Sequence, residues 1–209
     1  MTATPVTRHG LLRPWGLWTA GFLAFPIAGL AGRAVAGPID DLLAALVGGA
    51  MTGLIVGVGQ SLAGYGTFPA SRWIPATALG MAVGLALGAA AVGYRTTLAD
   101  LALMGLLTGI PLGLAQALAL PASRERWLWA VTTPVLWGLG WTVTTVGGIA
   151  VDQQFTIFGA YGALTFSALS GLVLHGWIRR ERPSPRPRSA RRRRPPGRSR
   201  PPRPQPCPE

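Results

Sequence analysis

The sequence predicts an all-α integral membrane protein, in which six transmembrane helices form three repeated helical hairpins and a disordered Arg/Pro-rich tail follows. The first observation behind this prediction is composition. Of the 209 residues 49% are apolar and only 12% are charged, whereas soluble domains carry about 25% charged residues. The second observation is a set of six long apolar runs. The third is a pattern of tryptophan, glycine and glutamine that recurs along the chain.

The six apolar runs each approach the length that a membrane helix requires, which is about 20 mostly apolar residues. The short connections between them hold nearly all the charge outside the tail. Pro26, Pro111 and Pro134 fall inside runs, where neighbouring helices can satisfy the freed backbone groups. We therefore expect an N-terminal arm (1–14) followed by a transmembrane domain (15–178). The expected spans are 15–36, 42–63, 73–94, 98–120, 127–150 and 155–178.

The first run could instead belong to a signal peptide. Arg8 and Arg13 precede it, and the small residues AVA at 34–36 resemble a cleavage site. The apolar run from Trp15 to Gly32 is longer than a usual signal core, and it shares the pattern of the later runs. A membrane span is the favoured interpretation.

The placement of arginine predicts the orientation of the chain. If the loops are numbered alternately, one side receives seventeen arginines and the other receives only Arg33 and Arg95. Four acids, Asp40, Asp41, Asp100 and Asp152, fall on the side with few arginines, where they could pair with those two arginines at a solvated rim. Because cytoplasmic loops are enriched in Lys and Arg, we expect both termini in the cytoplasm.

The odd-numbered spans open with a shared Trp-x-x-x-Thr pattern. It reads WGLWT from Trp15, WIPAT from Trp73 and WAVTT from Trp129. We expect these three indoles at the cytoplasmic interface, with each N–H near the headgroups. One turn deeper, Thr77 and Thr133 can hydrogen-bond to the preceding turn or to a neighbouring helix.

The even-numbered spans carry small residues at every fourth position, followed three residues later by a polar side chain. Thr52 to Gln60 reads TGLIVGVGQ, and Thr108 to Gln116 reads TGIPLGLAQ. Small residues four apart share one helix face and allow two helices to approach closely in lipid. The three expected stripes are Gly49, Gly53 and Gly57; Gly105, Gly109 and Gly113; and Gly159, Ala163 and Ser167.

The polar residues that end the three stripes are Gln60, Gln116 and Ser170. We interpret them as clamps that hydrogen-bond across each hairpin near its cytoplasmic end. The alternative is that the three positions ring a central path or a ligand site. The clamp is favoured because glutamine has no charge to attract an ion, and because the third copy offers only a serine.

Active-site chemistry has little support in this sequence. An ionisable group inside a membrane is the usual sign of function, but His175 stands alone near the end of the last span. A headgroup contact is the favoured interpretation of this histidine. The chain has no paired nucleophile and base, metal-ligand spacing or nucleotide-binding motif. We expect neither an enzyme nor a cofactor, and the single Cys207 cannot form an internal disulfide.

The tail (179–209) holds twelve arginines against Glu181 and Glu209. Proline and like-charge repulsion predict an extended, disordered segment. Its position after the last span makes anionic lipid headgroups the expected partner, whereas nucleic acid would bind only nonspecifically. The residues expected at the lipid surface are Arg179, Arg180, Arg191, Arg192, Arg193 and Arg194.

These motifs resemble those of a broad group of small, uncharacterised bacterial multi-pass membrane proteins. The resemblance rests on GxxxGxxQ, RWIPATALG and GLGWTV within residues 11–178. It implies the hairpin architecture and a bacterial plasma membrane, and it implies no activity. Ser61 and Leu62 follow Gln60 where that group often has an aromatic–aliphatic run. We therefore expect a structural or regulatory protein acting through partners or lipids, with a transporter or channel for a small neutral solute as the alternative.

Overall fold

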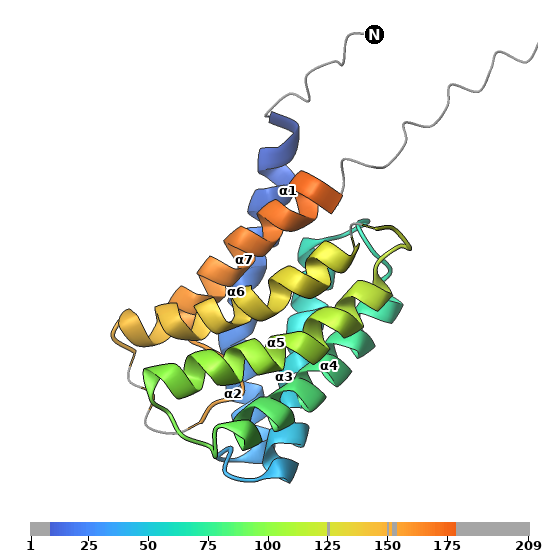
Figure 1. Ribbon diagram of the computed structural model, residues 1–209. Helices are drawn as coiled ribbons and strands as arrows, with labels where there is room; N and C mark the ends of the chain where they lie inside the picture. The colour runs from blue at the N-terminus through green and yellow to red at the C-terminus, as the bar shows by residue number, and fades with distance from the viewer. Residues whose placement is uncertain (1–8, 125, 150, 152–153, 179–209) are drawn as a thin grey trace, which may run out of the picture.

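The computed structural model describes residues 9–124, 126–149, 151 and 154–178, and within them every regular element is a helix (Figure 1). This confirms the all-α class. The elements in chain order are α1 (His9–Ala20), η1 (Gly21–Leu23), α2 (Ala24–Ala36), α3 (Leu42–Ala63), α4 (Ala70–Ala91), α5 (Leu98–Ala119), α6 (Arg126–Val146), α7 (Ala160–Val173) and the π-helical turn η2 (Leu174–Ile178).

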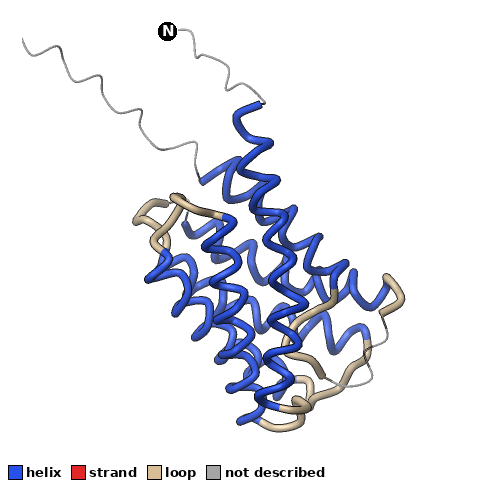
Figure 2. The backbone as a smooth tube through the Cα atoms, turned by 180° about the vertical axis from the view of Figure 1, so that it is seen from behind, coloured by secondary structure: helices blue, strands red, loops and turns tan. Residues whose placement is uncertain are grey.

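The helices pack in chain order and close into a ring. Helix α2 packs against α3, and then each of α3, α4, α5 and α6 packs against its successor. The ring closes because α7 packs against α1 and η1 (Figure 1). Seen from behind, the tube shows the same set of long helices joined by short loops at their ends (Figure 2). The first and last helices are therefore neighbours, although they lie more than 130 residues apart.

Within the described residues, four helical segments are long and apolar enough to cross a membrane. They are Leu12–Ala36, which joins α1, η1 and α2, and the helices α3, α4 and α5. Helix α6 has 21 residues, but four Trp and five Thr lower its hydropathy. Helix α7 has only 14 residues before its backbone changes to π-helical. Membrane crossing by these last two helices stays a prediction.

Local sequence explains where several helices begin and bend. The Asp41 side chain accepts a hydrogen bond from Ala44 N at 2.7 Å and so caps α3. Thr97 accepts one from Asp100 N at 3.2 Å and caps α5 in the same way. The first segment tightens to a 3₁₀ turn just before Pro26, because proline cannot donate a backbone bond and clashes with the preceding turn.

The last two expected spans are shorter than the sequence analysis predicted. Helix α6 ends at Val146 rather than at residue 150, since Gly147 and Gly148 follow and Gly148 has a φ of 83°. Helix α7 begins at Ala160 rather than at residue 155. Residues 155–158 are instead non-helical, and Ile157 and Phe158 are buried in the core.

Glycines set the close approach of neighbouring helices. A Cβ atom added at Gly53 of α3 would lie 2.6 Å from Thr77 O of α4. A Cβ at Gly113 of α5 would lie 2.9 Å from Thr133 Cβ of α6. Both contacts leave no room for a side chain, which is how small residues bring helix backbones together. Gly57 faces α4 and Gly109 faces α6 in the same manner.

Helix α4 carries a stripe of its own that the sequence analysis missed. A Cβ at Gly80 would lie 2.7 Å from Leu112 Cα, and one at Gly88 would lie 2.6 Å from Met104 O. Between these two positions, a Cβ added at Gly84 would meet the backbone of Thr108. These three glycines of α4 therefore face α5, whereas the predicted stripe of α3 faces α4 and that of α5 faces α6.

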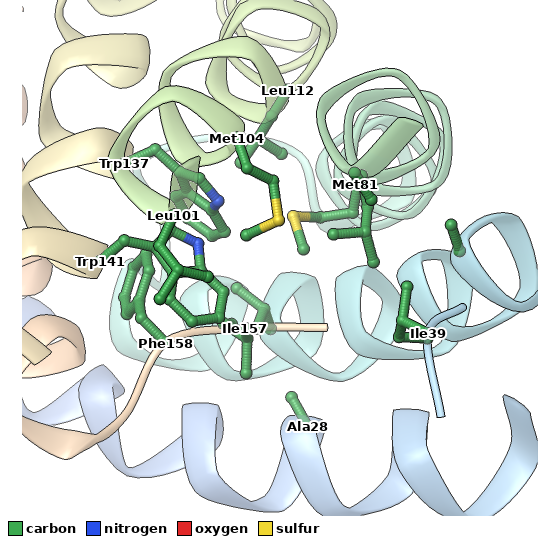
Figure 3. Packing of buried hydrophobic residues seen from close by; sticks show 14 of the residues in the cluster. Ala28, Ile39, Met81, Leu101, Met104, Leu112, Trp137, Trp141, Ile157 and Phe158 are labelled. Carbon is green, nitrogen blue, oxygen red and sulfur yellow. The ribbon is translucent and has the colours of Figure 1, made fainter. Parts of the chain in front are cut away.

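Apolar side chains fill the interior of the ring. Met81 and Met104 point toward each other from α4 and α5, and Trp137, Ile157 and Phe158 approach them from the other side (Figure 3). Met81 and Met104 are both fully buried. Apolar side chains from α4, α5, α6 and the residues just before α7 therefore pack together at the centre of the described part of the bundle.

Candidate functional site

Three tryptophans from three helices meet at the end of the ring where the described chain begins and ends. Trp18 comes from α1, Trp73 from α4 and Trp129 from α6. Their ring centroids are 6.3 Å apart for Trp18 and Trp73, 6.0 Å for Trp18 and Trp129, and 5.7 Å for Trp73 and Trp129. The rings meet edge to face, a favourable geometry for aromatic pairs.

Each of these indoles donates its N–H to a polar side chain on an adjacent helix. Trp73 Nε1 donates to Gln60 Oε1 of α3 at 3.0 Å, and Trp129 Nε1 donates to Gln116 Oε1 of α5 at 3.0 Å. Trp18 Nε1 donates to Ser170 Oγ of α7, also at 3.0 Å. We call these six residues the Trp–Gln cluster. All six are buried.

Gln116 joins two of these helix pairs into one network. Its Nε2 group donates to Gln60 Oε1 at 3.2 Å and to Thr77 Oγ1 at 2.9 Å. Thr77 in turn donates to Trp73 O at 2.8 Å, and Thr133 donates to Trp129 O at 2.7 Å. The amide of one glutamine therefore links α5 to α3, α4 and α6 at one level of the bundle.

The structure corrects the expected place of the tryptophans at this end. Trp73 and Trp129 are 0% and 1% exposed, so their N–H groups bond inside the protein and do not reach headgroups. In the first helix, Trp18 rather than Trp15 occupies the corresponding position. Trp15 is half-buried and donates to Ala168 O at 2.9 Å. The motif WGLWT contains both tryptophans, and sequence spacing favoured the wrong one.

Two further rings cover the Trp–Gln cluster. Phe68, in the loop before α4, stacks on Trp73 with ring centroids 4.1 Å apart. His175 lies edge to face with Trp18 at 6.3 Å and is 3% exposed. Burial corrects the expectation that His175 contacts headgroups. The π-helical turn that contains it directly follows α7, and its first residue, Leu174, is fully buried as well.

Helix α7 uses its small residues differently from the expected stripe. Ala163 and Ser167 are buried. A Cβ added at Gly162, however, would meet Gly140 O of α6. Gly159 lies outside the helix, and a Cβ there would meet the Ile149 side chain. Of the predicted stripe, only Ala163 and Ser167 therefore lie within α7, because the helix starts at Ala160.

The opposite end of the ring is apolar within and charged at its rim. Arg95 forms a bidentate ion pair with Asp100, at 3.1 Å and 3.0 Å, as the sequence analysis suggested. The hydrogen bond to Asp100, helped by its charge, raises the pKa of Arg95. Both groups are solvent-accessible, so this is a surface pair. The Arg33 guanidinium instead lies over the Phe155 ring, 5.5 Å from its centroid.

The Trp–Gln cluster can hold helices together but offers little reactive chemistry. Indole, amide and hydroxyl groups do not change charge near neutral pH, and most of those here already bond to each other. In the part of the chain that the structure describes, no three His, Cys, Asp or Glu side chains gather where they could hold a metal ion. The tail arginines, Asp152 and Cys207 lie outside the described residues.

No family model, no curated protein and no solved structure matches this chain.

Proposed function

We propose that this chain is a non-catalytic integral membrane protein that crosses the membrane six times as three related hairpins and acts through lipids. The observation that carries the proposal is the distribution of apolar surface. Large apolar side chains remain exposed all around the ring while its interior is filled. An exposed apolar surface of this extent is typical of a protein that faces lipid. Examples from four helices are Leu30, Leu54, Leu87 and Leu114.

The proposal of three related hairpins draws support from the Trp–Gln cluster. The two Trp–Gln bonds have the same length, and each joins residues 13 apart in sequence. Gln60 and Gln116 are themselves 56 residues apart. In the third pair, Ser170 replaces glutamine and its partner Trp18 comes from the beginning of the chain. The third hairpin unit would thus be completed by the first helix.

The proposed orientation places both termini in the cytoplasm of a bacterium. The Trp–Gln cluster then lies toward the cytoplasmic side, and Arg33 and Arg95 lie toward the outer side. The basic tail would add contacts to anionic headgroups, because each basic residue near such a surface contributes about 1 kcal/mol. The transporter alternative has weaker support, since methionines and aromatic rings occupy the space that a central path would need.

The single cysteine provides the test of membrane topology. Cells are treated with a membrane-impermeant maleimide before and after lysis, and the membranes are washed with alkaline carbonate. We expect the chain to stay in the washed membranes and Cys207 to react only after lysis. Extraction of the chain by carbonate would refute membrane integration. Labelling of Cys207 in intact cells would refute the proposed orientation.

The lipid part of the proposal is tested by removing residues 181–209. Full-length and truncated chains, purified in detergent, are compared for co-purified anionic lipid and for flotation with vesicles containing phosphatidylglycerol. We expect the truncated chain to insert equally well and to retain less anionic lipid. Identical lipid retention by both chains would exclude a role for the tail.

A further inference from the structure

An apolar pocket of about 410 Å³ lies at the end of the ring opposite the Trp–Gln cluster. It is bounded by α2 on one side. On the other side it is bounded by α6, by residues 149, 151, 155 and 157–159, and by the start of α7. Its volume is within the range of pockets that hold small ligands. The pocket exists because residues 155–158 leave the helical path and pack inward instead of extending α7.

The pocket has a buried aromatic wall and an open rim. Phe25, Trp141 and Phe158 form the wall, and each is 2% exposed or less. Leu30 at the rim is 73% exposed, and Ala160 beside it is also exposed. The pocket therefore opens through the outer surface of the ring, which is the surface that faces lipid in the proposed function.

One cation stands at this opening. Among the described residues that line the pocket, Arg33 alone carries a charge. It lies in the last turn of α2 with an exposed side chain. Its guanidinium is over the Phe155 ring, so the aromatic face holds the cation beside the rim. The ends of membrane helices lie at headgroup depth, where the anions within reach are lipid phosphates.

We propose that this pocket binds an anionic phospholipid, with one acyl chain against the aromatic wall and the phosphate on Arg33. The proposal rests on the membrane-embedded function proposed above. Charge complementarity decides the class of lipid. An arginine fork pairs with phosphate, and only an anionic lipid has a phosphate charge that no cation in its own headgroup already balances. The lateral opening of the pocket indicates that the ligand enters from the bilayer. A membrane lipid can reach the pocket through this opening without passing through water.

The test uses the full-length chain reconstituted in nanodiscs with phosphatidylglycerol that carries a photoreactive diazirine on its acyl chain. After illumination, peptide mass spectrometry maps the labelled residues. We expect labelling concentrated in residues 25–33, 149, 151 and 155–160. Because the sites are mapped, lipid bound at the tail is counted separately. Phosphatidylcholine with the same diazirine should label these residues about fivefold less, the ratio that one basic residue at a membrane surface contributes.

Two variants and two matched controls sharpen the result. Arg33→Gln removes the cation, and Ala160→Phe places a ring at the rim from an exposed helical position. Each should lower labelling of the pocket several-fold. Arg72→Gln makes the same charge change on an exposed arginine at the other end of the bundle, and Ala99→Phe adds a ring at an exposed position early in α5. Both controls should label like the parent chain.

Each contrary result overturns a defined part of the inference. Equal labelling by the two lipids, or labelling spread evenly around the ring, would refute a site for an anionic lipid. Displacement of the photoreactive lipid by a free fatty acid but not by unlabelled phosphatidylglycerol would refute the phospholipid as occupant. If the chain stays in carbonate-washed membranes while these results appear, the pocket inference fails alone and the proposed function stands.

Discussion

The two ends of the ring interior are stabilised in different ways. At one end, the Trp–Gln cluster combines three aromatic rings with directional hydrogen bonds between specific pairs of helices. At the other, Phe25, Phe158 and Phe166 pack with Trp137, with ring centroids between 4.7 Å and 6.2 Å apart. We call this second group the phenylalanine cluster. The comparison teaches that directional bonds fix which helices pair and at what level, while packing of rings fills volume.

The largest expected effect is at the phenylalanine cluster. Phe158→Ala would remove a ring that is 2% exposed and contacts three other rings and Trp141. We expect it to lower the free energy of unfolding by about 3–5 kcal/mol, the usual cost of a buried phenylalanine. Equilibrium unfolding in mixed micelles measures this change. Tyr161→Ala, at a nearby position that is 56% exposed, should cost far less, and equal costs would contradict the assigned packing.

The Trp–Gln cluster should respond less, and in a coupled way. Gln116→Leu removes one acceptor and two donors and leaves the Trp129 indole without its partner. We expect a loss of about 1–3 kcal/mol, the cost of leaving a buried polar group unsatisfied. Gln60→Leu and the double variant complete a cycle. The coupling energy between the two glutamines should be about 0.6–1.7 kcal/mol, as for other membrane hydrogen bonds, and additive losses would show that the two amides act independently.

A third pair of variants tests which tryptophan of α1 belongs to the cluster. Trp18→Phe keeps a ring but removes the bond to Ser170, and Trp15→Phe removes a bond to the backbone of Ala168 at a half-buried position. We expect Trp18→Phe to cost about 1 kcal/mol and Trp15→Phe to cost less. Thermal unfolding followed by near-ultraviolet circular dichroism ranks the two. If Trp15→Phe cost more than Trp18→Phe, Trp15 rather than Trp18 would belong to the Trp–Gln cluster.

The smallest effect is expected at the charged rim. Arg95→Gln removes the ion pair with Asp100, and exposed pairs of this kind contribute little. The pKa of Arg95 is raised in the folded chain, so the pair contributes below the ordinary arginine pKa and is lost only as the pH rises through the raised value. The small contribution of this pair to the free energy of unfolding should therefore not change with pH near neutrality. Unfolding midpoints of parent and variant measured across neutral pH check this expectation. Their difference should be small and constant, and a difference that changes with pH in this range would contradict it.

Much of the helical architecture was predictable because it depends on local chemistry. Helix α3 occupies the predicted range 42–63, and α5 departs from the range 98–120 by a single residue. The identities of Gln60 and Gln116 were predictable because a glutamine within an apolar run needs a partner on another helix. Prediction was poorest between α6 and α7, where two glycines end α6 early and the mixed polar and apolar sequence VDQQFTIF suits either a helix or an extended segment.

The sequence by itself determined which segments are helical, where small residues allow close packing, and which polar side chains need partners. These properties follow from hydropathy, residue size and capping groups within a few residues of each position. Only the tertiary structure decided that Trp18 completes the cluster with Ser170, and that Phe158 closes the far end beside a pocket carrying Arg33. The physical reason is distance along the chain. Contacts between residues 152 positions apart depend on how the ring closes, and no local pattern encodes that closure.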